Sequence, residues 1–431
     1  MKILYILGQF PVISETFILN EITSLIDLGH DIEIISLGRP KGVIFHAKAR
    51  EYDLINKTMY LEFNTREGRK KYSKKGLLLK TLTQFLIGST LSLKNKINLL
   101  HLSYEQKQGK EIALRKILDY LTIIKVIRET KPGVVYCHFG TIANQIIKLK
   151  SIINFRLVTY FHGFDFSLAP KRGIDYSLLF KKGDLFLTNS NYAKGKLIEL
   201  GCPEDRLSVI GLGIDLEKFK FKIRSIGDTV KLLTVARLVE KKGLKYSIEA
   251  VANSIKKHNN IIYNIIGEGP LRAELGNLIK SKGLEDKIFL LGAKTNEEVL
   301  SYMLESDIFI LSSVTADSGD TEGLGVILLE AQATGMPVLA TLHNGFPEAV
   351  RNGKSGFLVP EKDINALSER INYLVENPQI WKELGEEGRK HIFENYSQKK
   401  VINRLVAAVI SVTSHFRNTA KPSVKPLIRY F

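Results

Sequence analysis

Short apolar runs alternate with longer amphipathic runs from one end of this 431-residue sequence to the other. Such an alternation of strands and helices builds parallel sheets with helices on both faces. The polar residues 217–229 interrupt the series once and predict a linker between two units. The predicted strands are Lys2–Leu7, Asp31–Leu37, Val134–Cys137, Leu157–Phe161, Asp184–Thr188 and Leu207–Ile210 before the linker, and Lys231–Ala236, Ile261–Ile266, Ile288–Leu291, Ile308–Leu311, Val338–Ala340 and Gly356–Val359 after it. We therefore expect an α/β fold of two doubly wound, Rossmann-like domains that face each other across a ligand-binding cleft.

The limits of the domains follow from the same pattern. The first domain is expected to span residues 1–216 and the second residues 230–397. A helical stretch at 398–414 has one apolar face and is expected to return to the first domain. The basic tail at 415–431 contains two prolines and no acidic residue, so we expect it to be flexible. The apolar run at the N-terminus is too short for the core of a signal peptide, and the two cysteines lack metal-ligand spacing, which fits a reducing cytoplasm.

Much of the net charge of +17 lies in an insertion in the first domain, at about residues 64–116. Between residues 66 and 116 there are thirteen Lys or Arg residues against three Glu residues, interleaved with an apolar run at 76–91. A basic amphipathic segment is attracted to an anionic membrane surface. The apolar residues that this segment is expected to expose and to bury in the membrane are Leu77, Leu78, Leu79, Phe85, Leu86 and Ile87. We expect a cytoplasmic protein that is peripheral at the inner face of the plasma membrane.

The insertion has two other interpretations. Nucleic acid is not predicted, because few aromatic rings accompany the cations and the sequence contains no motif of a nucleic-acid-binding module. A helical hairpin that is simply exposed to solvent is the remaining alternative to the membrane surface.

Two carboxylates, Glu322 and Glu330, stand eight positions apart in the stretch EGLGVILLE. A helix beginning near Leu324 would separate them by roughly 12 Å, whereas carboxylate pairs that cleave sugar bonds lie about 5 to 9.5 Å apart. Glu330 lies among apolar residues, so its charge needs donors such as ligand hydroxyls. The amides of Gly323, Leu324 and Gly325 would favour a phosphate. The pattern predicts a ligand with hydroxyls at both ends and a phosphate between them; a core helix with one paired glutamate is the alternative.

Two cations, Arg237 and Lys242 of RLVEKKG, follow the strand that opens the second domain. Close to the carboxyl end of a strand, they would offset the negative charge of a diphosphate. Two surface cations in a loop are the alternative. The next strand is followed by GEGP, but Arg272 stands where a dinucleotide fingerprint has its third glycine. Nicotinamide chemistry is therefore not predicted.

These motifs resemble those of the retaining GT-B glycosyltransferases of family GT4, in particular the exopolysaccharide and colanic-acid branch. The resemblance covers about residues 1–410. It rests on EGLGVILLE from Glu322, RLVEKKG from Arg237, GEGP from Gly267, FHGFD from Phe161, and NSNYAKGKLIELGCPEDRLSVIGLGID from Asn189. It implies a GT-B fold and a nucleoside-diphosphate sugar as the donor. It also implies metal-independent transfer of a hexose with retention of configuration, so that no metal and no cofactor is expected.

The roles of the charged residues follow from this resemblance. Glu322 is expected to bind the donor sugar and Glu330 the nucleotide ribose, while Arg237 and Lys242 are expected to bind the diphosphate. The glycine-rich positions expected to contact the donor nucleotide are Gly323, Leu324, Gly325, Gly267 and Gly269.

Two histidines each follow a predicted strand of the first domain. The resemblance implies that His162 of FHGFD lies beside the donor sugar, and His138 of CHFG is a further candidate for holding either substrate. The first loop departs from the family pattern, because it reads GQFPVISET where many relatives have a pair of glycines near the diphosphate. Ser14, Glu15 and Thr16 would instead cap the first helix, and a close approach of this loop to phosphate is put in doubt.

The predicted function is transfer of a hexose from a nucleoside-diphosphate sugar to a saccharide, such as a lipid-linked oligosaccharide, in polysaccharide biosynthesis. The alternative is a non-catalytic nucleotide-sugar-binding partner of a polysaccharide assembly complex, against which the intact site motifs argue. An epimerase or a phosphorylase on the same fold is a third possibility. Asp317 and Asp320 lie close to Glu322 but form no recognisable metal site. The sugar, the base and the acceptor stay open.

Overall fold

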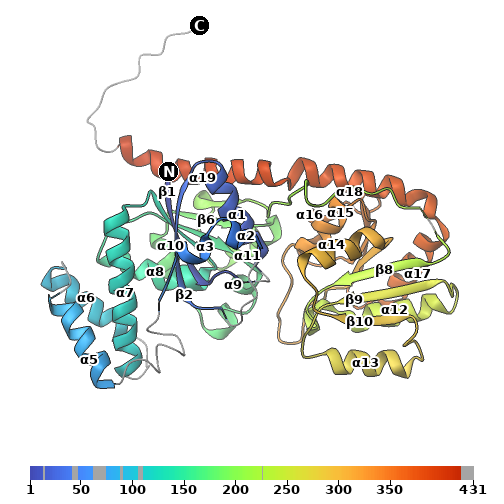
Figure 1. Ribbon diagram of the computed structural model, residues 1–431, viewed down its shortest axis with the longest axis horizontal. Helices are drawn as coiled ribbons and strands as arrows, with labels where there is room; N and C mark the ends of the chain where they lie inside the picture. The colour runs from blue at the N-terminus through green and yellow to red at the C-terminus, as the bar shows by residue number, and fades with distance from the viewer. Residues whose placement is uncertain are drawn as a thin grey trace, which may run out of the picture.

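The structure is a computed structural model that describes residues 1–12, 15–40, 47–61, 74–87, 91–104, 110–225 and 227–418. Two lobes lie side by side, and each is built on one sheet (Figure 1). Every pair of neighbouring strands in both sheets is parallel. The expected α/β fold with two doubly wound sheets is confirmed.

The first sheet has seven strands in the order β3-β2-β1-β4-β5-β6-β7. They are β1 (Lys2–Gln9), β2 (Asp31–Gly38), β3 (Thr58–Tyr60), β4 (Val134–His138), β5 (Leu157–Phe161), β6 (Leu185–Thr188) and β7 (Leu207–Val209). Every residue of β4, β5 and β6 is buried. Strands covered by helices on both faces need such continuous apolar runs, which explains why the sequence pattern located them.

The second sheet has six strands in the order β10-β9-β8-β11-β12-β13. They are β8 (Val230–Val235), β9 (Ile261–Ile266), β10 (Ile288–Gly292), β11 (Ile308–Leu311), β12 (Val338–Thr341) and β13 (Gly356–Val359). In each sheet the strand order reverses once, between β1 and β4 and between β8 and β11. Loops at the carboxyl ends of such strands form the ligand sites of doubly wound folds.

All the predicted strands are present, with ends that agree within two residues. The edge strand β3 was missed, because three residues are too few for a visible alternation of apolar and polar positions. The helices of the first lobe are α1 (Thr16–Asp27), α2 (Ala47–Glu51), α3 (Leu54–Lys57), α5 (Lys74–Leu82), α6 (Leu93–Tyr104), α7 (Lys110–Thr130), α8 (Gly140–Ile146), α9 (Gly163–Ser167), α10 (Ser177–Lys182) and α11 (Asn191–Glu199). Those that follow are α12 (Leu244–Ile255), α13 (Arg272–Ser281), α14 (Asn296–Glu305), α15 (Val326–Ala333), α16 (Phe346–Ala349), α17 (Ile364–Glu376), α18 (Trp381–Asn395) and α19 (Gln398–Asn418).

The expected cap of the first helix is not observed in the described residues. Helix α1 begins at Thr16 after Glu15, whose side chain makes no capping hydrogen bond. Ser14 lies outside the described residues.

The polar stretch 217–229 is anchored to the second lobe, which its composition did not predict. Arg224 is buried within it and donates hydrogen bonds to the backbone carbonyls of Lys222, Met303, Ser306 and Thr334. A buried guanidinium needs this many acceptors, because each unpaired donor would lose its hydration without compensation. Burial lowers the pKa of Arg224 to about 10.

Helices α18 and α19 follow each other along one side of the molecule, α18 over the second lobe and α19 over the first (Figure 1). Apolar residues of α19, among them Val401 and Leu405, belong to the same core cluster as Ile3 of β1. The two crossings of the chain between the lobes touch each other: the Ile214 amide donates to Tyr396, and the Gln398 amide donates to Ile214. Residues 419–431, most of the predicted tail, lie outside the described residues.

The basic insertion forms helices in its described parts. Helices α5 and α6 pack on α7 at the outer end of the first lobe (Figure 1). Leu77 and Phe85 are buried, so the expectation that they belong to an exposed apolar surface is wrong. The large apolar residues that are exposed here, between 44% and 76%, are Leu78, Leu79 and Leu82 of α5 and Leu93, Ile97 and Leu100 of α6. The side chains of Leu86 and Ile87 lie outside the described residues.

Candidate functional site

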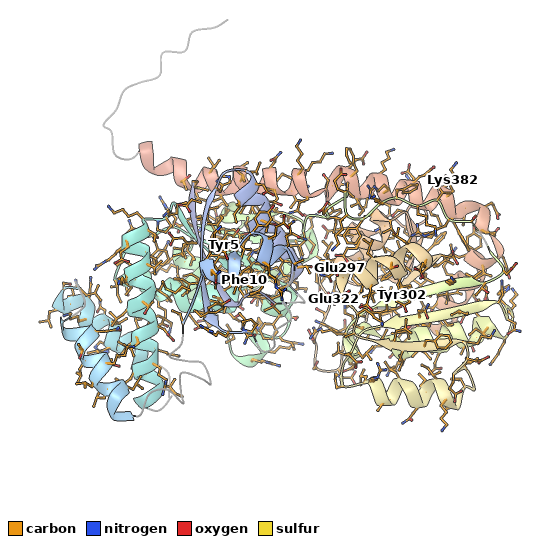
Figure 2. The ribbon with its side chains drawn as sticks, in the orientation of Figure 1. Tyr5, Phe10, Glu297, Tyr302, Glu322 and Lys382 are labelled. Atoms are coloured by element: carbon orange, nitrogen blue, oxygen red, sulfur yellow. The ribbon has the colours of Figure 1, made fainter. Side chains whose placement is uncertain are left out.

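The predicted site residues of the second lobe lie on loops at the carboxyl ends of its strands. Arg237 and Lys242 follow β8, and Glu322 lies on the long loop after β11. Figure 2 places Glu322 at the edge of the second lobe that faces the first. The strand order therefore brings together residues that are about eighty positions apart, at the point where the order of the second sheet reverses.

Glu322 forms an ion pair with Lys242, whose Nζ lies 2.6 Å from Oε2 of the carboxylate. Burial alone would raise the pKa of Glu322, but the charges of Lys242 and Lys241, together with the hydrogen bond from Lys242, outweigh it and hold the pKa below its ordinary value. Glu322 is thus a carboxylate that stays ionised in a mostly dry place. Such a group can accept strong hydrogen bonds from ligand hydroxyls.

A buried histidine that the sequence reasoning missed holds the Glu322 loop. His343, just after β12, accepts a hydrogen bond at Nε2 from the Glu322 amide, at 3.1 Å. Its Nδ1 lies 2.5 Å from Oε1 of Glu361, whose other oxygen accepts from the Thr315 amide. Asn344 donates to the Glu322 carbonyl at 2.7 Å. Both peptide groups of Glu322 are therefore fixed, which defines where its carboxylate lies.

Arg237 differs from Lys242 in being exposed, and its guanidinium makes no hydrogen bond or ion pair within the described part of the chain. It is therefore available to an anion. The glycines of GEGP pack against the same loop: an added Cβ would lie 1.8 Å from the Ala236 oxygen at Gly267 and 2.4 Å from the Leu238 oxygen at Gly269. Their lack of a side chain is thus needed for loop packing, and a contact of either glycine with nucleotide stays a prediction.

Helix α15 begins later than expected. The structure starts it at Val326, after Gly325 in a left-handed conformation (φ 72°), so Glu322 precedes the helix by four residues. The expectation of a helix from Leu324 is therefore wrong, and the separation between Glu322 and Glu330 that was based on it stays a prediction. An added Cβ at Gly325 would lie 2.7 Å from the Phe346 ring, so close packing as well as backbone conformation requires glycine here.

Glu330 lies on α15, half-buried. Burial raises the pKa of its carboxyl group to about 7, although the charge of Lys218 lowers it. Within the described residues its carboxylate has no hydrogen bond and no ion pair. The environment expected for Glu330, a carboxylate short of donors, is therefore present, while its ribose role stays a prediction.

The two lobes touch beside Glu322. An added Cβ at Gly163, directly after His162, would lie 3.6 Å from the Gly323 nitrogen. Asn189, at the end of β6, has its side chain next to Gly323, and its Oδ1 is buried without a hydrogen-bond partner. Sequence reasoning gave Asn189 no role, because an asparagine after a strand has many ordinary uses. A buried carbonyl oxygen without a donor beside a candidate site is free to accept from a ligand.

His162 begins helix α9 directly after β5 and is mostly buried. Its Nε2 lies 3.1 Å from Nδ1 of His138, and Nε2 of His138 lies 3.0 Å from Oε1 of Glu21 on α1. Tyr5 of β1 donates to the same oxygen at 2.7 Å. Burial and the neighbouring His138 hold the pKa of His162 well below its ordinary value, so its ring is neutral. The structure thus brings the two predicted histidines into contact and adds Glu21.

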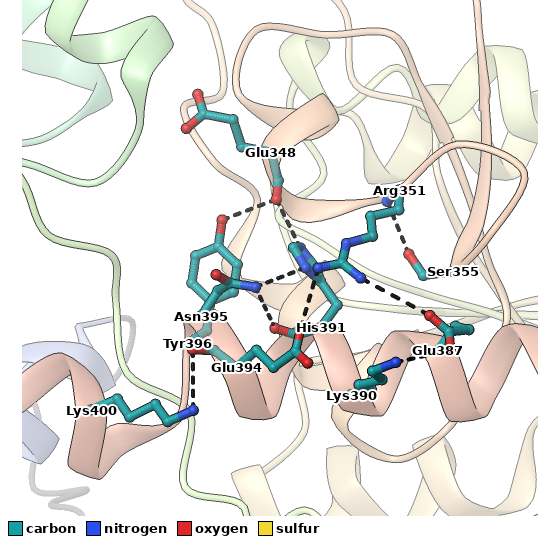
Figure 3. Close-up of polar contacts among 10 residues, drawn as sticks. All are labelled: Glu348, Arg351, Ser355, Glu387, Lys390, His391, Glu394, Asn395, Tyr396 and Lys400. Carbon is teal, nitrogen blue, oxygen red and sulfur yellow. Dashed lines mark hydrogen bonds and ion pairs between the residues drawn. The ribbon is translucent and has the colours of Figure 1, made fainter.

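A second contact between the lobes centres on Glu348 of α16. Its carboxylate accepts hydrogen bonds from the Asn191 amide, the Asn191 side chain and the Tyr192 amide, at the first turn of α11 in the first lobe. Its carbonyl accepts from His391 and Tyr396 (Figure 3). Figure 3 also shows the carboxylate pointing away from these two partners. One residue therefore joins α11, α16 and α18.

Among the parts of the chain that the structure describes, no group of three or more His, Cys, Asp or Glu side chains is arranged to hold a metal ion. A surface hollow of about 530 Å³ lies elsewhere, between β13, α17 and α18, with Phe357 and Tyr373 in its wall, and contains none of the predicted site residues.

The chain matches two family models over most of its length. Residues 14–218 match the model described as Glycosyltransferase Family 4, and residues 215–391 match the one described as Glycosyl transferases group 1. A relative named amylovoran biosynthesis glycosyltransferase AmsK, from Erwinia amylovora, is 37% identical over 85% of this chain and 89% of its own. A second relative is named colanic acid biosynthesis glycosyltransferase WcaL, from Escherichia coli K12. It is 33% identical over 95% of this chain and 99% of its own.

Solved structures share the fold at lower identity. Anabaena Alr3699/HepE in complex with UDP has a TM-score of 0.70 at 17% identity, over 95% of this chain and all of its own. A glycosyltransferase from Rickettsia africae has a TM-score of 0.69 at 19% identity, over 95% of this chain and 98% of its own.

Proposed function

The chain belongs to glycosyltransferase family 4, with the GT-B fold, in the branch that contains the amylovoran and colanic acid enzymes, and we propose that it moves a hexose from a nucleoside-diphosphate sugar to a saccharide, with retention of configuration. The observation that carries this proposal is the ion pair of Glu322 and Lys242 where the lobes touch, with the exposed Arg237 in the same segment after β8 as Lys242. A partly buried, ionised acceptor at the end of one strand and an exposed cation after a neighbouring strand match a ligand with hydroxyls at one end and a diphosphate behind them. The UDP bound to the structural neighbour HepE supports a nucleotide ligand.

In this proposal each part of the donor is bound by different residues. Glu322 accepts hydrogen bonds from the sugar hydroxyls, and Glu330 accepts from the ribose. Arg237, Lys242 and the amides at Gly323 to Gly325 offset the charge of the diphosphate without a metal ion. The bond between the anomeric carbon and the diphosphate oxygen breaks while the acceptor oxygen attacks from the same face. The proton of the acceptor hydroxyl passes to the departing diphosphate oxygen.

A direct test is release of nucleoside diphosphate. The protein would be incubated with a panel of UDP- and GDP-sugars and with lipid-linked saccharides, with and without EDTA. We expect release from one donor, dependent on an acceptor and unaffected by EDTA. Tight binding of a nucleotide-sugar without turnover on any acceptor would instead identify the non-catalytic partner of an assembly complex, and loss of activity with EDTA would contradict transfer without a metal.

We also propose that helices α5 and α6 press the first lobe onto an anionic membrane surface at the cytoplasmic side. Their six exposed large apolar residues provide apolar surface that a membrane could cover, and Lys80, Lys94 and Lys96 belong to the same two helices. Attraction to anionic lipid contributes about 1 kcal/mol for each cation near the surface. No helix within the described residues combines the length and the hydropathy needed to cross a bilayer.

Vesicle co-sedimentation tests this surface. We expect binding to vesicles that contain anionic lipid, weakened but not abolished by high salt, which screens the charges and leaves the apolar contact. The double variant Leu79→Ser, Leu93→Ser should bind several-fold more weakly. Leu28→Ser is the matched control, because Leu28 is also a strongly exposed leucine but lies at the end of α1. Equal binding of the double variant and the control would contradict the proposal, as would binding to neutral vesicles alone. Lys70, Lys71, Lys74 and Lys75 belong to the same basic insertion, and their side chains lie outside the described residues.

A further inference from the structure

A row of four hydrogen-bonded side chains leads from the interior of the first lobe to His162. We call Tyr5, Glu21, His138 and His162 the buried row. Tyr5 lies within the first sheet, well inside the lobe that faces Glu322 (Figure 2). Tyr5 belongs to β1, Glu21 to α1 and His138 to the end of β4, and His162 follows β5. Three other parts of the fold are therefore linked to His162 through this row.

The direction of the hydrogen bonds follows from the chemistry of the groups. An ionised carboxylate only accepts, so Glu21 requires a proton on Nε2 of His138. A neutral His138 then has a bare Nδ1, which can only accept. His162 must in turn donate from Nε2, and its Nδ1 is left as the bare nitrogen. The charge of Glu21 thereby selects one tautomer at each ring, as a second hydrogen bond does for other functional histidines.

The surroundings of the buried row favour these tautomers over the opposite ones. His138 has no exposed surface, and Glu21 is buried as well. The rings of Tyr5 and Tyr160 stack on His138, and Phe17 packs against both histidines. No water can replace a missing partner in such a place, so the opposite tautomer would set two donors or two acceptors face to face.

We propose that Glu21 and His138 are positioning residues for glycosyl transfer, which fix the tautomer and the ring plane of His162 where the lobes touch. The inference rests on the proposed function, because that function puts the donor sugar beside His162. Glu21 and His138 lie behind His162 and touch no substrate themselves. Their effect is therefore expected on the rate of transfer and not on binding of the nucleotide, which the proposed function gives to the second lobe.

Nitrogen NMR of the histidine rings tests the tautomers of the buried row and does not depend on an activity assay. Protein labelled with ¹⁵N-histidine would be measured at pH 8, where ordinary histidines are neutral, and His138→Gln and His162→Gln would assign the signals. We expect both rings to carry their proton on Nε2 in the natural protein. The isosteric Glu21→Gln removes the charge, because an amide can donate as well as accept, and should shift His162 toward the other tautomer. A natural protein with His162 protonated on Nδ1 would overturn the inference.

Steady-state transfer gives the second readout. We expect Glu21→Gln to lower kcat at least tenfold, with the KM of the donor and the affinity for UDP or GDP within about twofold of the natural protein. Glu21→Asp keeps the charge and should recover part of kcat and the original tautomer, which a purely structural role would not require. Glu33→Gln is the control, because Glu33 of β2 forms an ion pair with Lys2 and is not a member of the buried row.

The outcomes separate this inference from the function on which it rests. An unchanged kcat in a folded Glu21→Gln variant, or an unchanged His162 tautomer, overturns the positioning role. If Glu21→Gln does not fold, Glu21→Asp and the tautomers of the natural protein still decide. If the natural protein transfers no sugar at all, the proposed function fails, whereas the NMR result judges the row independently.

Discussion

Affinity for a nucleoside diphosphate should rise with pH because of one carboxyl group, that of Glu330. Its pKa is raised to about 7 by burial, and within the described residues no donor stabilises its charge. At a pKa of about 7 the free group is about one-tenth ionised at pH 6 and about nine-tenths ionised at pH 8. Ribose hydroxyls that donate to the carboxylate bind only its ionised form fully. Affinity should therefore be about tenfold higher at pH 8 than at pH 6, with about half a proton released on binding at pH 7.

Isothermal titration with UDP and with GDP, on the natural protein and on Glu330→Gln, measures this effect. Losing a charged hydrogen-bond partner costs about 1.5 to 3 kcal/mol, so the variant should bind more than tenfold more weakly at pH 8. The difference in affinity between the natural protein and the variant should be smaller at pH 6, where the natural carboxyl group is mostly protonated. Titration of the phosphate itself is common to both proteins and cancels in the comparison. A 2′-deoxynucleotide, which lacks one donor, should narrow the gap as well.

The stability of the unliganded protein should change with pH in the direction opposite to the affinity for nucleotide. A carboxyl group whose folded pKa lies above its unfolded value of 4.5 makes the folded state hold more protons between pH 4.5 and 7. Its contribution to stability therefore falls as the pH rises through that window. Glu330→Gln should accordingly raise the melting temperature of the unliganded protein at pH 8 while weakening nucleotide binding. The same pH dependence of affinity in both proteins would refute the reasoning.

Three further predictions concern other residues. Glu322→Ala and Arg237→Ala should each lower transfer at least a hundredfold in a protein that still folds, measured as nucleoside diphosphate release; a well-folded variant with near-normal turnover would remove that residue from the site. Arg224→Met should cost on the order of 3 kcal/mol in urea unfolding, because several buried carbonyls lose their donor; a cost below about 1 kcal/mol would mean that the segment is not anchored through this side chain. Glu348→Gln should increase hydrogen exchange at the first turn of α11 and leave exchange in α15 unchanged, and equal protection in both proteins would show that Glu348 does not hold the lobes together.

The sequence predicted the sheets well, because strands covered on both faces need unbroken apolar runs, such as those of β4 and β5. It also placed Arg237 and Glu322 at one edge, since the carboxyl ends of parallel strands meet there. The contacts between these residues were beyond it. The partner of Lys242 lies eighty positions away in the sequence. Only the packed sheet shows that Lys242 is paired with Glu322 and is not a free cation.

The residues that hold the site in place were the least predictable. Glu21 and His343 look like ordinary members of a helix and a loop, and their hydrogen bonds exist only after three or more elements have packed. The insertion shows the same limit. Its composition indicated an amphipathic segment, but the choice between Leu77, which is buried, and Leu79, which is exposed, depends on how α5 turns on α7.

The paired crossings at Ile214 and Gln398 mean that the first lobe is not a continuous piece of the chain, because the whole second lobe lies between its two parts. A fragment that ends at the linker would keep every strand of the first sheet but lose α19, and would bare the apolar surface that Val401 and Leu405 cover. A fragment that begins at the linker would keep α19 as an amphipathic arm with nothing to cover. Anyone who wishes to express one half alone, or to exchange halves between relatives, has to cut twice and move residues 398–418 together with the N-terminal half.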